Sequence, residues 1–320
     1  MTRPSLGAVV IGRNEGDRLK ACLHSLVPVC DRVVYVDSGS RDDSVAFARG
    51  LGVTVVELDT TTPFTAARAR NAGFQALIAA GDLDLAQFVD GDCTVQDGWL
   101  AAGTDALAAD PTLGLVTGWR SEIHPGASVY NQMCQVEWRR PAGPITACGG
   151  DMMVRTTAFH QIGGFDPTVI AAEDDEFCLR LAKAGWKLVR LPVEMTRHDA
   201  NMTRFGQWWQ RAKRAGHGFA QLNQMHPPHF RREKLRVGVY GLVLPLILVL
   251  GLFISGWIVL AVAAVYALSW WKTWRGLAGQ PMAARQAALL TLAKIPNLLG
   301  MLTYHRRRRK GEDMRIIEYK

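Results

Sequence analysis

Residues 88–99 read FVDGDCTVQDGW, and here an apolar run ends in two carboxylates separated by one glycine. The run LAQFV (85–89) has the length and composition of a buried strand. Asp90 and Asp92 therefore lie at a strand exit, where two carboxylates could share a hard divalent cation, directly or through water. Asp is also a favoured turn residue, so the pair alone favours a solvated turn, and the surrounding residues must decide.

Short β-branched runs alternate with helical patterns on the N-terminal side of this stretch. Strands are predicted at 6–11, 32–36, 53–57 and 85–89, with a helix between each pair. This order predicts an α/β fold with a mostly parallel sheet and flanking helices. In such a sheet ligands bind beyond the carboxyl ends of the strands.

Polar side chains follow the other predicted strands too. The first strand ends in GRNEG, which contains Asn14 and Glu15, and the second ends at Asp37 before a glycine-containing turn. The helix after the third strand carries three more candidates: Arg68, Arg70 and Asn71. Asn14 and Asp37 could merely cap helices, and the arginines could form a solvated face. Four successive strand exits of this kind nevertheless favour a phosphate-bearing ligand.

Five motifs in a fixed order give the chain a specific resemblance. They are VVYVDSGSRDDS, ARARNAG, FVDGDC, the GGDMMVR...IGGFD segment and EDDEFCLRLAKAGW. Over about residues 6–220 the set resembles family 2 glycosyltransferases of the GT-A fold. The resemblance implies a nucleotide-diphospho-sugar transferase that contacts nucleotide and phosphate through Asn14, Glu15, Asp37, Arg68, Arg70, Asn71 and Asp90. Ser38 stands where many members have a second Asp, so the resemblance implies no particular nucleotide base in the donor.

The resemblance also implies a metal and a general base. Asp90 and Asp92 resemble the DxD that binds Mg²⁺ or Mn²⁺ on the donor diphosphate. The segment AAEDDEFCLRLAKAGW opens with four carboxylates, 173–176, at the start of a predicted helix. The helix macrodipole favours such residues by about 0.3–1 kcal/mol each, so some have only that role. Asp174 resembles the base that deprotonates an acceptor hydroxyl, which gives inversion.

Further residues complete the implied site. Glu173, Gly149, Gly150 and Asp151 are expected on the acceptor side, since glycines allow close backbone approach. His198, after the predicted strand in RLPVEMTRHDAN, can reach metal or diphosphate in the family, and a structural histidine is equally compatible. Arg211 and Arg214 lie in FGQWWQRAKRAGHG, a helix that closes over the nucleotide in membrane-linked relatives. The alternative for this helix is an amphipathic segment on a membrane surface.

The C-terminal third differs in charge and hydropathy. Residues 1–200 hold 18 Lys/Arg against 25 Asp/Glu, whereas residues 201–320 hold 19 against 4. We therefore predict a catalytic domain at 1–225 and a membrane anchor at 226–320. Residues 237–271 contain no charge, and as one helix they would span about 52 Å against a hydrocarbon core of about 30 Å. A helical hairpin turning at Ser255-Gly256 is expected, with both basic flanks in the cytoplasm.

A third apolar segment, 283–304, is interrupted by Lys294, Pro296 and Asn297 and precedes a basic tail at 306–310. An interfacial helix is favoured over a third crossing, because a third crossing would place the basic tail outside. The basic tail then lies on anionic lipid. A solvated tail or a nucleic-acid patch is the alternative.

The six cysteines are scattered without a CxxC pair, which predicts neither a zinc site nor a disulfide framework and fits a reducing compartment. No export is expected, because the apolar run LGAVVI near the N-terminus is too short for a signal peptide and leads directly into charge. We expect an inverting, metal-dependent glycosyltransferase at the cytoplasmic face of the inner membrane, with a lipid-linked or cell-envelope glycan acceptor and no nucleic-acid partner. One alternative is a non-catalytic, membrane-tethered nucleotide-sugar binding or scaffold protein. The Glu-Asp pair at 173–174 argues against it, because a binding protein does not need a general base. A nucleotidyltransferase usually opens with a glycine-rich basic loop, which GRNEGDR matches poorly.

Overall fold

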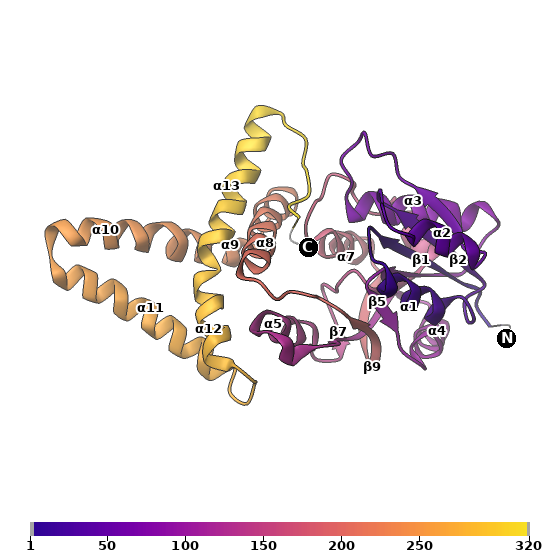
Figure 1. Ribbon diagram of the computed structural model, residues 1–320, viewed down its shortest axis with the longest axis horizontal. Coiled ribbons are helices and arrows are strands. Elements are labelled where there is room, and N and C mark those ends of the chain that lie inside the picture. The colour runs from indigo at the N-terminus through magenta and orange to yellow at the C-terminus, as the bar shows by residue number, and fades with distance from the viewer. Residues whose placement is uncertain (1–2, 319–320) are drawn as a thin grey trace. The chain divides into compact units, whose positions relative to one another are not determined.

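The computed structural model describes residues 3–318 (Figure 1), and the chain divides into two compact units. We call residues up to His124 together with Glu137–Ala200 the sheet unit. Pro125–Val136 together with the chain from Asn201 onward form the helical unit. Residues 201–225 group with the C-terminal helices in this division, and the catalytic-domain boundary at residue 225 stays a prediction.

The sheet unit begins with the predicted alternation of strands and helices. Its first elements are β1 (Leu6–Gly12), α1 (Asp17–Leu26), β2 (Arg32–Asp37), α2 (Ser44–Gly50), β3 (Thr54–Glu57), α3 (Ala66–Ala79) and β4 (Leu85–Asp90). The chain continues through β5 (Cys93–Val95), α4 (Trp99–Ala109), β6 (Leu113–Glu122), β7 (Gly143–Pro144), β8 (Met152–Arg155), α6 (Thr156–Gln161), α7 (Glu173–Lys183) and β9 (Lys187–His198).

The sheet has the strand order β3-β2-β1-β4-β8-β6-β9-β5, and β7 also pairs with β9. The first four strands pair in parallel, as predicted. The second half is mixed, because β8 lies between β4 and β6 and runs antiparallel to both. The expected α/β sheet with flanking helices is thus confirmed, and parallel pairing recurs between β6 and β9 in its mixed second half.

The parallel register brings the ends of three strands to one edge. Gly12 at the end of β1 is opposite Asp37 at the end of β2, and Ile11 is opposite Asp90 at the end of β4. Both faces of the sheet are covered, because neighbouring residues alternate between the two cores. Val10 packs with α1 and α4 on one face, and Val9 packs with α3, α6 and α7 on the other. Each fully buried side chain of this size contributes about 1.5–3 kcal/mol.

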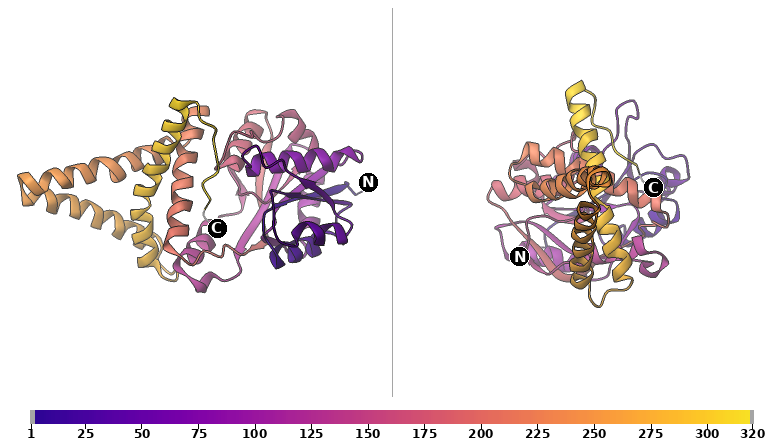
Figure 2. Two further views of the ribbon diagram at one scale, coloured as in Figure 1. Left: turned by 45° about the horizontal axis from the view of Figure 1, so that its top comes forward. Right: turned by 90° about the vertical axis from the view of Figure 1, so that its left-hand side faces the viewer.

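The helical unit contains η1 (Pro125–Ala127) and most of α5 (Val129–Trp138), followed by the C-terminal helices. These are α8 (Phe205–Met225), α9 (Arg231–Gly238), the π-helical η2 (Val239–Val243), α10 (Leu244–Ile254), α11 (Gly256–Gly276), α12 (Ala283–Leu292) and α13 (Lys294–Lys310). Figures 1 and 2 show α10 and α11 as a hairpin, and α8 lying along α13. The hairpin turns at Ser255, as predicted, and the Ser255 hydroxyl accepts a hydrogen bond from the Trp257 amide at 3.3 Å.

Between residues 3 and 318, three helical segments are long and apolar enough to cross a membrane: Arg231–Ile254, Gly256–Gly276 and Ala283–Lys310. The third is longer than the predicted 283–304 because α13 continues to Lys310. The predicted interruption appears as the junction between α12 and α13, and Pro296 lies in the first turn of α13, where a missing amide is tolerated.

Helices α8 and α13 pack with backbone contact. A Cβ atom on Gly216 would lie 2.0 Å from the Asn297 carbonyl oxygen, and one on Gly300 would lie 1.9 Å from the Lys213 carbonyl oxygen. Only glycine permits this approach at either position. The close contact explains why α8 belongs to the helical unit.

Candidate active site

Asp90, at the end of β4, is held by two arginines. Its Oδ1 accepts a hydrogen bond from Arg70 Nη2 at 2.8 Å, and its Oδ2 lies 3.8 Å from Arg120 Nη2. Burial alone would raise the pKa of Asp90, but Arg70 and Arg120 outweigh burial and hold it below its ordinary value. Asp90 is therefore ionised at neutral pH.

Arg70 bridges two of the predicted motifs. Its guanidinium is 2% exposed, and its Nη1 donates to Glu173 Oε1 at 2.8 Å while Nη2 binds Asp90. A Cβ atom on Gly150 would lie 2.2 Å from Arg70 Nη2, so glycine is required there for the guanidinium to fit. The bridge fixes the start of α7 against the end of β4.

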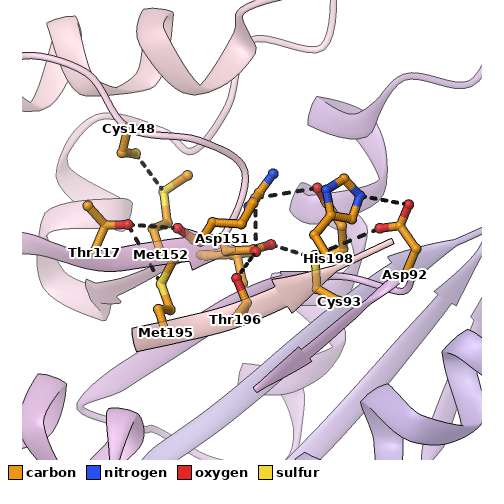
Figure 3. A network of polar contacts seen from close by, with 12 residues as sticks. Asp92, Cys93, Thr117, Cys148, Asp151, Met152, Met195, Thr196 and His198 are labelled. Carbon is orange, nitrogen blue, oxygen red and sulfur yellow. Dashed lines mark hydrogen bonds and ion pairs between the residues drawn. The ribbon is translucent and has the colours of Figure 1, made fainter. Parts of the chain in front are cut away.

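Asp151 supports this arrangement from within the sheet. Its side chain is fully buried, and Figure 3 shows its carboxylate beside Thr196. Oδ1 accepts a hydrogen bond from the Asp90 amide at 3.0 Å, and Oδ2 accepts one from Thr196 Oγ1 at 2.6 Å and lies 2.9 Å from Arg120 Nη2. Asp151 thus orients Asp90 and Arg120 from a buried position, and its expected place on the acceptor side stays a prediction.

Asp92 and His198 form the second half of the strand-end cluster. β5 and β9 pair so that Cys93 is opposite His198, which places the histidine beside the carboxylate. His198 Nε2 lies 3.0 Å from Asp92 Oδ2, and both side chains are buried (Figure 3). The His198 ring also packs on Trp138, with 4.5 Å between the ring centroids.

These residues fit a divalent metal ion. The ligand atoms of Asp92, Cys93 and His198 lie within 4.8 Å of one another, and within residues 3–318 the buried His198 Nδ1 has no hydrogen-bond partner. Burial, together with the nearby carboxylates, raises the pKa of the Cys93 thiol well above its ordinary value. Asp92 offers a carboxylate, the ligand type that suits Mg²⁺ and Mn²⁺, and His198 offers an imidazole.

The four carboxylates at the start of α7 have different environments. Glu173 pairs with Arg70, and Glu176 pairs with Arg180 at 2.6 Å. Within the described part of the chain, no basic side chain forms an ion pair with Asp174, and burial, Glu173 and Asp175 raise its pKa well above the ordinary value. A carboxylate whose pKa is raised toward neutrality can accept a proton at physiological pH.

Two family models match the chain. The model described as "Glycosyl transferase family 2" matches residues 8–156. The model described as "Glycosyl transferase family group 2" matches residues 117–293, which is more than half of the 320 residues. The chain is a family 2 glycosyltransferase.

Curated relatives agree with this assignment. This glycosyltransferase is 28% identical over 235 residues to the pre-mycofactocin glycosyltransferase of Mycobacterium tuberculosis H37Rv, covering 68% of this chain and 47% of the relative. It therefore spans about half the length of that relative. A shorter segment of 82 residues is 37% identical to the N-acetylglucosaminyl-diphospho-decaprenol L-rhamnosyltransferase of the same strain and covers 25% of this chain and 26% of that protein.

A solved structure shares the fold. The mannosyltransferase PcManGT from Pyrobaculum calidifontis, in complex with GDP-Man and Mn²⁺, superposes with a TM-score of 0.61 at 18% identity. The match covers 95% of this chain and 88% of that one. This likeness confirms the GT-A fold of the family 2 glycosyltransferase.

The predicted nucleotide-binding residues shape two adjoining loops of the enzyme. Asp37 Oδ2 accepts hydrogen bonds from the amides of Gly39 and Ser40, at 2.9 and 2.8 Å. Asn14 has a left-handed backbone, with φ of 56°, and its Oδ1 accepts a hydrogen bond from the Arg41 amide. Glu15 pairs with Arg18 at 2.8 Å. Contact of these residues with a nucleotide stays a prediction.

The arginine-asparagine motif on α3 has internal partners instead of an open surface. Arg68 donates to the carbonyl oxygens of Thr62 and Asp59, and the Asn71 amide group both donates to and accepts from the Phe165 backbone. Together with the buried bridge made by Arg70, these bonds give the motif a structural role that its sequence alone does not reveal.

The remaining predicted residues are Gly149, Arg211 and Arg214, and two residues near the site were not predicted. Gly149 adjoins Arg120, because a Cβ atom on Gly149 would lie 3.5 Å from Arg120 Nη2. Arg211 and Arg214 lie on α8 in the helical unit, and their approach to a nucleotide stays a prediction. Arg120 and Trp138 escaped the sequence analysis, since residues 118–148 show no motif. The sequence signal for Arg120 was its position as a basic residue in the mostly apolar strand β6.

Proposed function

We propose that this glycosyltransferase moves a sugar from a nucleoside-diphosphate sugar to a lipid-linked or cell-envelope glycan acceptor, with inversion and with a divalent metal ion. The observation that carries the proposal is the Arg70 bridge. It joins the ionised Asp90 at a strand end to Glu173, the residue directly before the proposed base Asp174. A binding protein would not need a carboxylate of raised pKa at this place.

Asp92 and His198 would hold the metal ion, through a carboxylate oxygen and a ring nitrogen, with Asp90, the other carboxylate of the predicted pair, as a further candidate ligand. When bound, the ion stabilises the negative charge of the departing diphosphate. The Mn²⁺ and GDP-Man held by the related mannosyltransferase structure support this choice of ion and donor class. Asp90, fixed by Arg70, Arg120 and the Asp151 carboxylate, would orient the donor from the strand end.

Asp174 would act as the general base. The acceptor hydroxyl gives its proton to an Asp174 carboxylate oxygen while the hydroxyl oxygen attacks the anomeric carbon. The bond from that carbon to the diphosphate oxygen breaks on the opposite face, so one displacement inverts the configuration. A positioned base of this kind contributes about 10²- to 10⁴-fold in rate.

The apolar helices support a membrane location. Basic residues flank the α10–α11 hairpin on both sides, from Arg231 to Arg236 and from Lys272 to Arg275, which favours a cytoplasmic position for both ends. The catalytic part would then face the cytoplasm at the inner membrane. The name of the decaprenol-linked rhamnosyltransferase relative supports a lipid-linked acceptor.

Calorimetric titration tests the proposal. The detergent-solubilised full chain is titrated with UDP, GDP, dTDP and CDP, with and without Mn²⁺, beside Asp92→Ala. We expect one nucleotide to bind in a metal-dependent way and Asp92→Ala to lose the metal dependence. Absence of binding for every nucleotide by folded protein would reject the proposal in favour of a non-catalytic scaffold.

A further inference from the structure

One face of α13 carries an apolar stripe that is partly exposed. Ile295, Leu299 and Leu302 are 38%, 40% and 53% exposed, and their spacing continues to Arg306. Residues separated by three and four positions lie on the same side of a helix, so the four side chains form one line. The other side of α13 is buried through Pro296, Asn297, Gly300, Met301 and Tyr304.

The stripe leads to a basic cavity at the end of α13. Gly311 has the left-handed conformation, with φ of 62°, and reverses the chain so that Arg307 Nη1 donates to the Arg315 carbonyl oxygen at 2.7 Å. The cavity measures about 510 Å³ and is lined by Arg306, Arg307, Gly311, Glu312, Asp313 and Arg315. Lys310 lies 3.7 Å from Glu312 and partly offsets its charge, so the lining is positive overall.

We infer that this cavity binds the phosphate headgroup of an anionic glycerophospholipid whose acyl chain lies along Ile295, Leu299 and Leu302. Guanidinium groups bind phosphate with two parallel hydrogen bonds, and three arginines, Arg306, Arg307 and Arg315, line this cavity. The inference rests on the membrane location proposed above, and it is independent of sugar transfer.

The length of the stripe favours a membrane phospholipid over a long polyprenyl phosphate. From Ile295 to Arg306 the helix rises roughly 16 Å, at about 1.5 Å per residue. This length matches one acyl chain, since two such chains end to end fill a hydrocarbon core about 30 Å thick. A glycerophospholipid would therefore place its acyl chain on the stripe and its phosphate in the cavity.

The experiment compares two triple variants that lose the same charge. Arg306→Gln/Arg307→Gln/Arg315→Gln removes the arginines that line the cavity. Arg308→Gln/Arg309→Gln/Lys310→Gln removes three neighbouring charges that do not line it. The full chain in neutral detergent is titrated with phosphatidylglycerol and with phosphatidylcholine of the same acyl chains, and native mass spectrometry counts the bound lipid.

We expect wild type and the control variant to prefer phosphatidylglycerol, and the cavity variant to lose about tenfold in affinity for it, as expected for lost charge-assisted bonds. Circular dichroism verifies that both variants fold. Equal losses in the two variants would show non-specific attraction to the basic tail and would overturn the inference, as would equal binding of both lipids.

Competition distinguishes the possible sources of phosphate. Displacement of phosphatidylglycerol by an equal concentration of pyrophosphate, or at least tenfold tighter binding of a polyprenyl phosphate, would overturn the assignment to a phospholipid. Sugar transfer is measured on the same samples. Wild type that transfers sugar but shows no lipid preference rejects this inference alone, whereas wild type that prefers phosphatidylglycerol but transfers no sugar rejects the proposed function alone.

Discussion

The buried guanidinium of Arg70 offers a sharp test of how the site is built. Arg70→Met keeps a long, flexible side chain on α3 but removes the charge between Asp90 and Glu173. Both ion pairs have N–O distances of 2.8 Å, and the side chains of Arg70, Glu173 and Asp90 are 2%, 8% and 29% exposed. The variant therefore leaves two carboxylates desolvated, Glu173 most of all.

The expected cost follows from this burial. Removing one partner of a buried ion pair costs about 3–5 kcal/mol, because the remaining charge stays unpaired. Asp90 keeps Arg120 at 3.8 Å, so Glu173 carries most of the loss. For a unit of this size, about 2–4 °C per kcal/mol gives a decrease in apparent Tm of roughly 6–20 °C.

The assay is thermal unfolding of the solubilised full chain, followed by circular dichroism, with Arg68→Met as the matched control. Arg68 lies on the same helix and donates only to backbone carbonyl oxygens that lie near the surface, so we expect its loss to cost about 0.5–1.5 kcal/mol. Equal decreases in Tm for the two variants would refute the bridging role of Arg70.

The pH dependence of Tm gives a second test of the Arg70→Met variant. Asp90 has a depressed pKa in the folded wild type, so its contribution to stability is present above the unfolded pKa of about 3.9 and is lost as pH falls through the folded pKa. The difference in Tm between wild type and Arg70→Met should therefore shrink below about pH 4. A difference that stays constant down to pH 3 would contradict this electrostatic explanation.

Three further outcomes are expected. Asp174→Asn should have a higher Tm than wild type as pH rises beyond about 4, because the raised pKa of Asp174 makes its ionisation costly in the folded state. Thermal unfolding of both proteins at pH 4 and pH 8 checks this. Equal Tm values at pH 8 would contradict it. His198→Ala should weaken Mn²⁺ binding at least about tenfold in calorimetric titration with nucleotide present, and unchanged affinity would remove His198 from the metal site. Gly300→Ala should destabilise the protein by about 1–3 kcal/mol, because its Cβ would meet the Lys213 carbonyl oxygen at 1.9 Å. Gly276→Ala, with no atom within 4 Å, is its control in the same melting experiment, and equal Tm values would refute the close packing of α8 on α13.

Local periodicity was enough to predict the first four strands and the exit positions of Asp37 and Asp90. The place of β8 between β4 and β6 was not predictable in this way, because antiparallel insertion depends on pairing between distant segments. The same holds for Arg120, which meets Asp151 from a segment without any motif. The direction of side chains could not be predicted from the sequence either. The motif around Arg70 placed this residue near the site, but the burial of Arg70 between Asp90 and Glu173 depends on the packing of three elements.

Sugar transfer by reconstituted protein tests the central claim most directly. Vesicles holding the full chain receive Mn²⁺ and the radiolabelled sugar of whichever nucleotide binds, and label in the extracted lipid is counted beside Asp174→Asn. We expect wild type to transfer label and Asp174→Asn to be slower by about 10²- to 10⁴-fold while still binding the nucleotide. Transfer by Asp174→Asn at the wild-type rate would contradict the assignment of Asp174 as the base.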